Sequence, residues 1–89
     1  MEDQVRNRII GFIVSNFLFG DVSRSPQDDE SLLESGILDS TGILELIQFL
    51  ETDFEIEVAD SETVPDNLGT VANLTRFVLA RIPDGRPTR

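Results

Sequence analysis

Apolar residues recur every three or four positions in three separate stretches of this 89-residue chain. That spacing places them on one face of an α-helix, so it predicts helices over about residues 4–18 and 40–54, and a last helix that begins after Thr70. The residues that define the three faces are Val5, Ile9, Phe12, Ile13 and Phe17, then Ile43, Leu46, Ile47, Leu50 and Phe54, then Val71, Leu74, Phe77, Val78 and Ile82. We therefore expect an all-α domain.

Capping residues support these boundaries and add one shorter helix. Asp39 or Ser40 suits the N-cap of the second long helix, and Thr70 suits that of the last, because their side-chain oxygens accept hydrogen bonds from free backbone N–H groups. Pro65 fits the first position of a short helical turn over about residues 64–68. The prediction is a small four-helix bundle with three main helices and one short one.

The connection between the first two long helices is about twenty residues long. Gly20 ends the first helix, and residues 21–31 are polar enough to form a loop. Four apolar residues, interrupted by Gly36, are then expected to anchor the connection to the core: Leu32, Leu33, Ile37 and Leu38. A loop of that length in so small a domain is typical of a functional segment.

Composition narrows the possible functions. The chain has no Cys, His, Lys, Tyr or Trp, which removes disulfides, the usual zinc ligands and the commonest general base. So small a helical core also leaves little room for a desolvated catalytic pocket. We expect a single domain over residues 1–83, ended by Pro83, with a flexible tail over residues 84–89, and we do not expect an enzyme.

Charge is distributed unevenly along the chain. Between Asp21 and Asp66 there are fourteen acidic residues and one base, Arg24, whereas six arginines lie outside that segment. An acidic surface repels nucleic acid and anionic lipid and attracts basic protein surfaces, although it also serves solubility. The apolar stretch over residues 9–19 is too short to span a bilayer and does not have the flanks of a secretion signal. We expect a cytoplasmic protein that binds neither nucleic acid nor membranes.

The segment over residues 36–46 carries the most informative motif. Ser40 lies where the long loop meets the start of a helix, so a group attached to its hydroxyl would extend into solvent. A phosphate there would meet free N–H groups and the positive end of the helix dipole. Most Asp-Ser pairs before helices are only caps, so Asp39 and Ser40 by themselves do not decide between a cap and a modification site.

With its surroundings, the motif resembles that of the acyl carrier protein and peptidyl carrier protein family. In that family an Asp-Ser pair is followed by Glu-Leu five and six positions after the serine, and here Glu45 and Leu46 occupy those positions. Residues 34–38 resemble the approach to the family motif, and residues 54–58 resemble the segment after its second helix. The similarity extends over residues 9–82.

The resemblance implies a carrier that is not an enzyme. A phosphopantetheinyl transferase would move the 4′-phosphopantetheine arm of coenzyme A to the Ser40 hydroxyl, and Asp39 would assist by helping to hold magnesium in the complex. An activating ligase would load an acyl or aminoacyl group as a thioester on the arm. Downstream acyl-transfer enzymes with basic surfaces would then use it. The carrier is expected to be a monomer that keeps its cargo at a high effective concentration.

Partner recognition is expected on the second long helix, beside the serine. Thr41, Leu44 and Gln48 follow one another at steps of three and four, on a face that differs from the core face. Glu45 and Glu51 are expected to form an acidic rim around them. Leu44 can also be interpreted as a scattered exposed apolar residue, which is common on protein surfaces.

Two features separate this chain from the general family pattern. Thr41 stands where the family usually has leucine, and Gly42 follows it. The Asp-Ser-Xaa-Gly order and residues 65–71 resemble discrete carriers that work with an adenylating ligase, D-alanyl carriers among them. This resemblance favours a dedicated biosynthetic pathway over housekeeping fatty-acid synthesis, and an aminoacyl cargo stays open.

Two other classes of protein compete with the carrier as interpretations of this sequence. A cofactor-free helical adaptor stays open, because the same pattern fits a carrier-like domain that has lost its arm. A calcium-binding loop is disfavoured, because Asp53, Glu55 and Glu57 alternate with large apolar residues and have no central glycine of the kind that an EF-hand loop needs.

Overall fold

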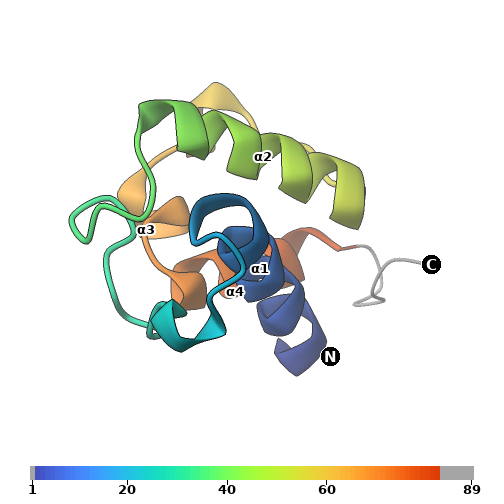
Figure 1. Ribbon diagram of the computed structural model, residues 1–89. Helices are drawn as coiled ribbons and strands as arrows, with labels where there is room; N and C mark the ends of the chain where they lie inside the picture. Colours follow the sequence, from blue (N-terminus) through green and yellow to red (C-terminus); the bar gives the residue numbers. More distant parts are fainter. Residues whose placement is uncertain (1, 83–89) are drawn as a thin grey trace.

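A computed structural model describes residues 2–82 as a set of packed helices (Figure 1). The α-helices are α1 (Glu2–Phe17), α2 (Ser40–Phe54), α3 (Pro65–Leu68) and α4 (Val71–Arg81), with short 3₁₀ turns at Val22–Arg24 and Asp60–Glu62. Residues 2–82 contain no strand. The all-α prediction, with three main helices and one short one, is confirmed. The tail expected over residues 84–89 lies outside the described residues.

The ends of the helices follow the capping signals in the sequence. The bounds of α2 are those predicted, whereas α1 begins two residues earlier than expected, because Glu2 and Asp3 in its first turn suit a helix N-terminus. Gly20 has φ +80°, and its N–H donates to the Val14 carbonyl at 2.9 Å, which closes the end of α1. The Thr70 hydroxyl accepts from the Asn73 N–H at 3.0 Å and so caps α4, as predicted.

Helices α1 and α2 run antiparallel, and three contacts along their length show it. Arg8 pairs with Asp53 near the start of α1, the rings of Phe12 and Phe49 stack at 4.3 Å in the middle, and the ring of Phe17 lies against Gly42 at the end. The end of α1 therefore lies beside the start of α2.

The core is formed by one apolar face from each long helix. Helix α4 packs along α1, and α2 lies above them in the view of Figure 1. The buried side chains predicted for α4 are all in the core, while Phe12, Phe17, Ile43 and Ile47 of α1 and α2 are only half-buried at its edge. The buried apolar residues of the helices are Val5, Ile9, Ile13, Val14, Leu46, Leu50, Phe54, Leu68, Val71, Leu74, Phe77 and Val78.

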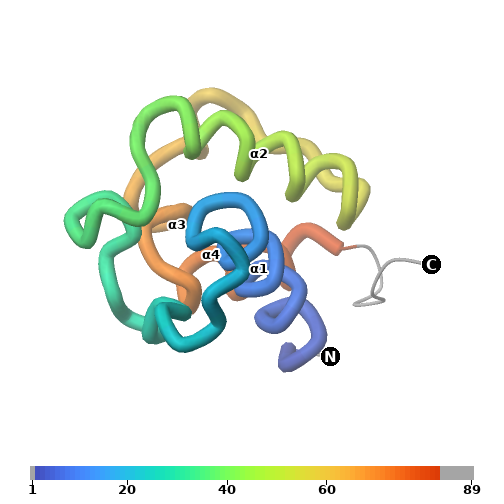
Figure 2. Tube along the Cα trace, viewed as in Figure 1, coloured from blue at the N-terminus to red at the C-terminus, as the bar shows by residue number. Residues whose placement is uncertain are grey.

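The long connection between α1 and α2 is tied to the rest of the molecule by backbone hydrogen bonds. Figure 2 shows that this connection passes around one side of the bundle and then leads to the start of α2. The N–H of Leu32 donates to the Gly69 carbonyl, and the N–H of Ala72 donates to the Asp28 carbonyl, both at 2.9 Å. Leu32 and Leu38 are buried anchors, as predicted. The prediction for Leu33 is wrong, because that side chain is 46% exposed.

Three ion pairs link two arginines of α1 and one of α4 to the acidic middle of the chain. Arg6 binds Asp28 at 2.6 Å, Arg8 binds Asp53, and Arg81 binds Glu62. Each pair joins two elements that are distant in sequence, and each neutralises one of the fourteen acids. No helix within residues 2–82 has the length and apolar character that crossing a membrane requires.

Candidate functional site

The start of α2 is built around Asp39. Its Oδ1 accepts a hydrogen bond from the Gly42 N–H at 2.7 Å, and its carbonyl accepts from the Ile43 N–H at 2.9 Å. The backbone of Asp39 is extended, with φ −120° and ψ −171°, as an N-cap residue requires. The capping oxygen therefore comes from Asp39, which settles the choice between Asp39 and Ser40 that the sequence left open.

Ser40 is the first residue of α2 and is exposed. Because Asp39 supplies the cap, the fold does not use the Ser40 hydroxyl for that purpose. The N–H groups of Ser40 and Thr41 precede the first intrahelical donor, the Ile43 N–H, so they are directed out of the helix end. A phosphodiester on the Ser40 oxygen would meet these donors and the positive end of the helix dipole, so the donor set fits a 4′-phosphopantetheine arm.

The residues expected to recognise partners line the outer face of α2. Thr41, Leu44 and Gln48 are all exposed, and the Leu44 side chain is 67% exposed. Glu45 is exposed beside them. The structure thus brings these four side chains to one solvent-facing surface that begins at the serine, and their role in recognition stays a prediction.

Glu51 lies differently from the other predicted surface residues. It is half-buried, and its Oε2 accepts a hydrogen bond from the Val58 N–H at 3.0 Å. That bond fixes the extended segment after α2, so Glu51 has a structural task that its sequence position did not reveal. Its contribution to an acidic rim stays a prediction.

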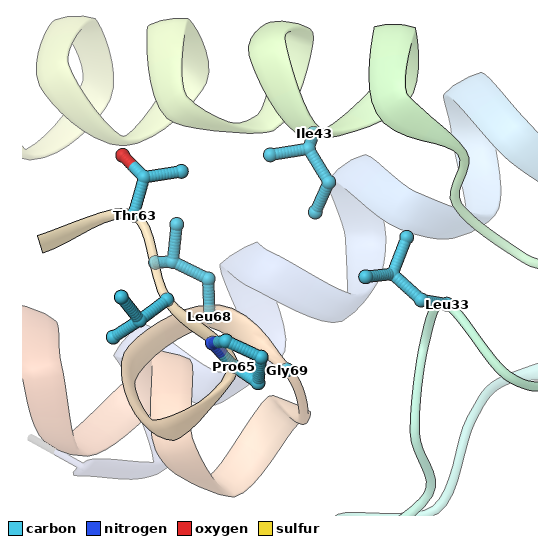
Figure 3. A pocket seen from close by; sticks show the side chains of 7 residues that line it. Leu33, Ile43, Thr63, Pro65, Leu68 and Gly69 are labelled. Atoms are coloured by element: carbon cyan, nitrogen blue, oxygen red, sulfur yellow. The ribbon is translucent and has the colours of Figure 1, made fainter. Parts of the chain in front are cut away.

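A small apolar pocket opens one helical turn beyond Ser40, between α2 and α3 (Figure 3). Ile43 points into it from α2, and Leu33 faces it from the long connection. Its volume is about 80 Å³, and Thr63, Val64, Pro65, Leu68 and Gly69 form the remaining wall. Leu33 was expected in the core and instead lines this pocket.

Gly42 matters at this site because it has no side chain. A Cβ placed there would lie 3.1 Å from the Phe17 ring, 3.3 Å from Asp39 Oδ1 and 3.3 Å from the Leu38 side chain. The missing side chain therefore lets α1, the cap and the loop meet at the start of α2. The sequence marked Gly42 only through a family resemblance, and nothing in its spacing revealed the contact.

The fold and the site together define a small helical domain with an exposed serine at the start of α2. D-alanyl carrier proteins of Streptococcus pyogenes serotypes M5, M49 and M1 are each 44% identical to this chain over 50 residues. The match covers 56% of this chain and 63% of the length of each relative, so it spans less than two thirds of those proteins. No family model matches the chain. The similarity supports the phosphopantetheine-type carrier family that the motif around Ser40 indicated.

Proposed function

We propose that this chain carries a small acyl or aminoacyl group as a thioester on a 4′-phosphopantetheine arm attached to Ser40. The observation that carries the proposal is the start of α2, where Asp39 supplies the cap and leaves the exposed Ser40 hydroxyl outside that task. The similarity to proteins named D-alanyl carriers supports it. The arm would supply the thiol, and the chain would hold and present it without catalysing a reaction.

The Asp39 carboxylate would have two roles during attachment: it caps α2, and it would help to hold magnesium. Oδ1 is held by the Gly42 N–H at 2.7 Å, which fixes the plane of the carboxylate beside the serine. The Asp39 carboxylate would help to hold a magnesium ion in the complex with a phosphopantetheinyl transferase, since hard cations prefer carboxylate ligands. Asp39→Asn would keep the cap and remove the negative charge, so it separates the two tasks.

The size of the pocket favours a small cargo. At about 80 Å³ it is little more than half the roughly 150 Å³ of an apolar cavity that admits benzene. It would cover a few carbon atoms beside Ile43 and leave a long acyl chain exposed. The name of the relatives favours an aminoacyl cargo, and the Asp-Ser-Xaa-Gly order favours a loading ligase that uses ATP.

Intact mass spectrometry tests the attachment and the loading in sequence. Incubation with coenzyme A and a broad-specificity transferase should add one phosphopantetheine to the chain and none to Ser40→Ala. An unchanged mass would favour the cofactor-free adaptor. The holo protein should then be loaded by a ligase with ATP and a free acid. Loading that occurs only by transfer from malonyl-coenzyme A would contradict the proposal that a ligase loads the carrier.

A further inference from the structure

The most exposed large apolar side chain among residues 2–82 is Phe19. It is 95% exposed, and Val22, three residues later, is 75% exposed. Single exposed apolar residues are ordinary on protein surfaces. This small domain, however, has only six aromatic residues, and one of them is left outside the core. The ring therefore contributes almost nothing to packing.

The backbone at Phe19 holds the ring in that exposed position. Its φ is +56°, in the left-handed region that bulky L residues rarely adopt. The turn is closed on both sides, because the Gly20 N–H donates to the Val14 carbonyl and the Asp21 N–H donates to the Leu18 carbonyl, each at 2.9 Å. Glycine or asparagine would fit this conformation with less strain. Neither the core nor the turn explains a phenylalanine here, and strain of this kind is common at functional positions.

Phe19 lies at the same end of the bundle as Ser40. Because α1 and α2 are antiparallel and the Phe17 ring lies against Gly42, the turn after α1 is beside the start of α2. Asp21 follows in the same turn, and hydrogen bonds from Ser23 lower the pKa of its carboxyl, so it stays ionised. Arg24 lies close enough to act on the same carboxyl, so the turn carries one acid and one base beside the apolar ring. An apolar ring beside an ionised acid complements an apolar pocket with a basic residue at its rim.

We propose that Phe19, flanked by Val22, docks into an apolar pocket on the basic surface of the phosphopantetheinyl transferase that modifies Ser40. The inference rests on the proposed function. The transferase is the partner that must act on the Ser40 oxygen itself, so it has to cover the protein surface around that residue. Enzymes that act later reach the thiol at the far end of the arm, so they can stand farther from this turn. Aromatic residues are also enriched among those that dominate binding energy.

The test measures the kinetics of Ser40 modification in four full-length proteins, with coenzyme A and a phosphopantetheinyl transferase. Phe19→Asn removes the ring and suits the left-handed backbone, and Phe19→Tyr keeps the ring. Asn7→Ala is the control, since Asn7 is exposed near the opposite end of α1. We expect Phe19→Asn to raise KM about tenfold with kcat nearly unchanged, as the loss of an interface anchor does. Phe19→Tyr and Asn7→Ala should resemble the unmodified sequence.

Thermal unfolding of the same proteins distinguishes docking from a role in folding. Phe19→Asn should unfold at the same or a higher temperature, because it relieves backbone strain. An unchanged KM would overturn the docking site while leaving Ser40 attachment intact. A marked fall in unfolding temperature, or self-association that depends on Phe19 without a change in KM, would also overturn it. Failure of the starting protein to gain any mass would remove the proposed function and the docking site together.

Discussion

The two ends of α2 use the same kinds of residues in opposite ways. At the C-terminal end, Asp53 pairs with Arg8, whose guanidinium lies 5.3 Å from the centre of the buried Phe54 ring. At the N-terminal end, Asp39 and Glu45 are exposed, and among residues 2–82 neither takes part in an ion pair.

The apolar residues differ in the same way as the charges. Phe54 is 3% exposed, whereas Leu44 is 67% exposed and Phe19, beside the start of α2, is 95% exposed. One end satisfies its charges and rings within the molecule. The other end leaves Glu45, Leu44 and Phe19 exposed to solvent, as the proposed docking surface requires.

The largest expected effect is all-or-none and concerns the serine. Ser40→Ala should abolish attachment of phosphopantetheine while leaving the helical fold unchanged, because the side chain is exposed and the cap comes from Asp39. Intact mass measures the attachment, and far-UV circular dichroism measures the helical content. Ser61 offers a matched control, since it also follows an aspartate and is exposed in a 3₁₀ turn. Attachment that survives in Ser40→Ala, or is lost in Ser61→Ala, would place the site elsewhere.

Two leucines on opposite faces of α2 separate stability from recognition. Leu46 is fully buried, so Leu46→Ala should lower the free energy of unfolding by about 3 kcal/mol. Leu44 is 67% exposed, so Leu44→Ala should change it by less than about 0.5 kcal/mol. Urea unfolding measures both values.

Binding to the transferase should respond differently to the exposed leucine. Leu44→Ala should mainly raise the rate of dissociation, because it removes a packed contact. If Leu44→Ala leaves binding unchanged, Leu44 is a scattered surface residue and the recognition face has to be redrawn.

Two glycines in helices should respond to alanine with opposite signs. A Cβ at Gly11 would meet open space beyond the helix's own backbone, so Gly11→Ala should raise the free energy of unfolding by roughly 1 kcal/mol through helix propensity. Gly42 is enclosed by the Phe17 ring, the Asp39 carboxylate and Leu38 at 3.1–3.3 Å, so Gly42→Ala should lower it by about 1 kcal/mol through overpacking. Urea unfolding again gives both values, and a stabilising Gly42→Ala would show that the start of α2 relaxes freely.

The sequence predicted the helices well because each is fixed by local signals. Periodic apolar residues indicated the faces of α1, α2 and α4. Gly20 marked the end of α1, Pro65 the start of α3 and Thr70 the start of α4. These signals act over a few neighbouring residues, so they are visible without the fold.

The features that escaped prediction depend on residues far apart in the chain. Leu33 lines a pocket with residues of α2 and α3, the Glu51 carboxylate accepts from the backbone of Val58, and Gly42 lies against Phe17 of another helix. No local pattern encodes such contacts. The position of Ser40 at the start of α2 was predictable, but the assignment of the cap to Asp39 required the geometry of the turn.

The smallest expected effect is electrostatic and compares one acid from each end of α2. Glu45→Gln removes an exposed charge near Ser40, so association with a basic transferase should slow by a factor of about two to three. Asp53→Asn removes the same charge at the far end, where Arg8 already neutralises it. It should cost at most about 1 kcal/mol of stability and change association little.

Stopped-flow association at several salt concentrations sharpens this last contrast. Screening at about 0.15 M salt limits the reach of the field to roughly 8 Å, so the difference between the two variants should shrink as salt is added. Adding Glu51→Gln to Glu45→Gln should slow association further and flatten its salt dependence, and glutamine at position 51 can still accept the Val58 N–H bond. Equal effects of Glu45→Gln and Asp53→Asn would mean that the acids act only through net charge. The two ends of α2 would then differ in packing but not in electrostatic steering.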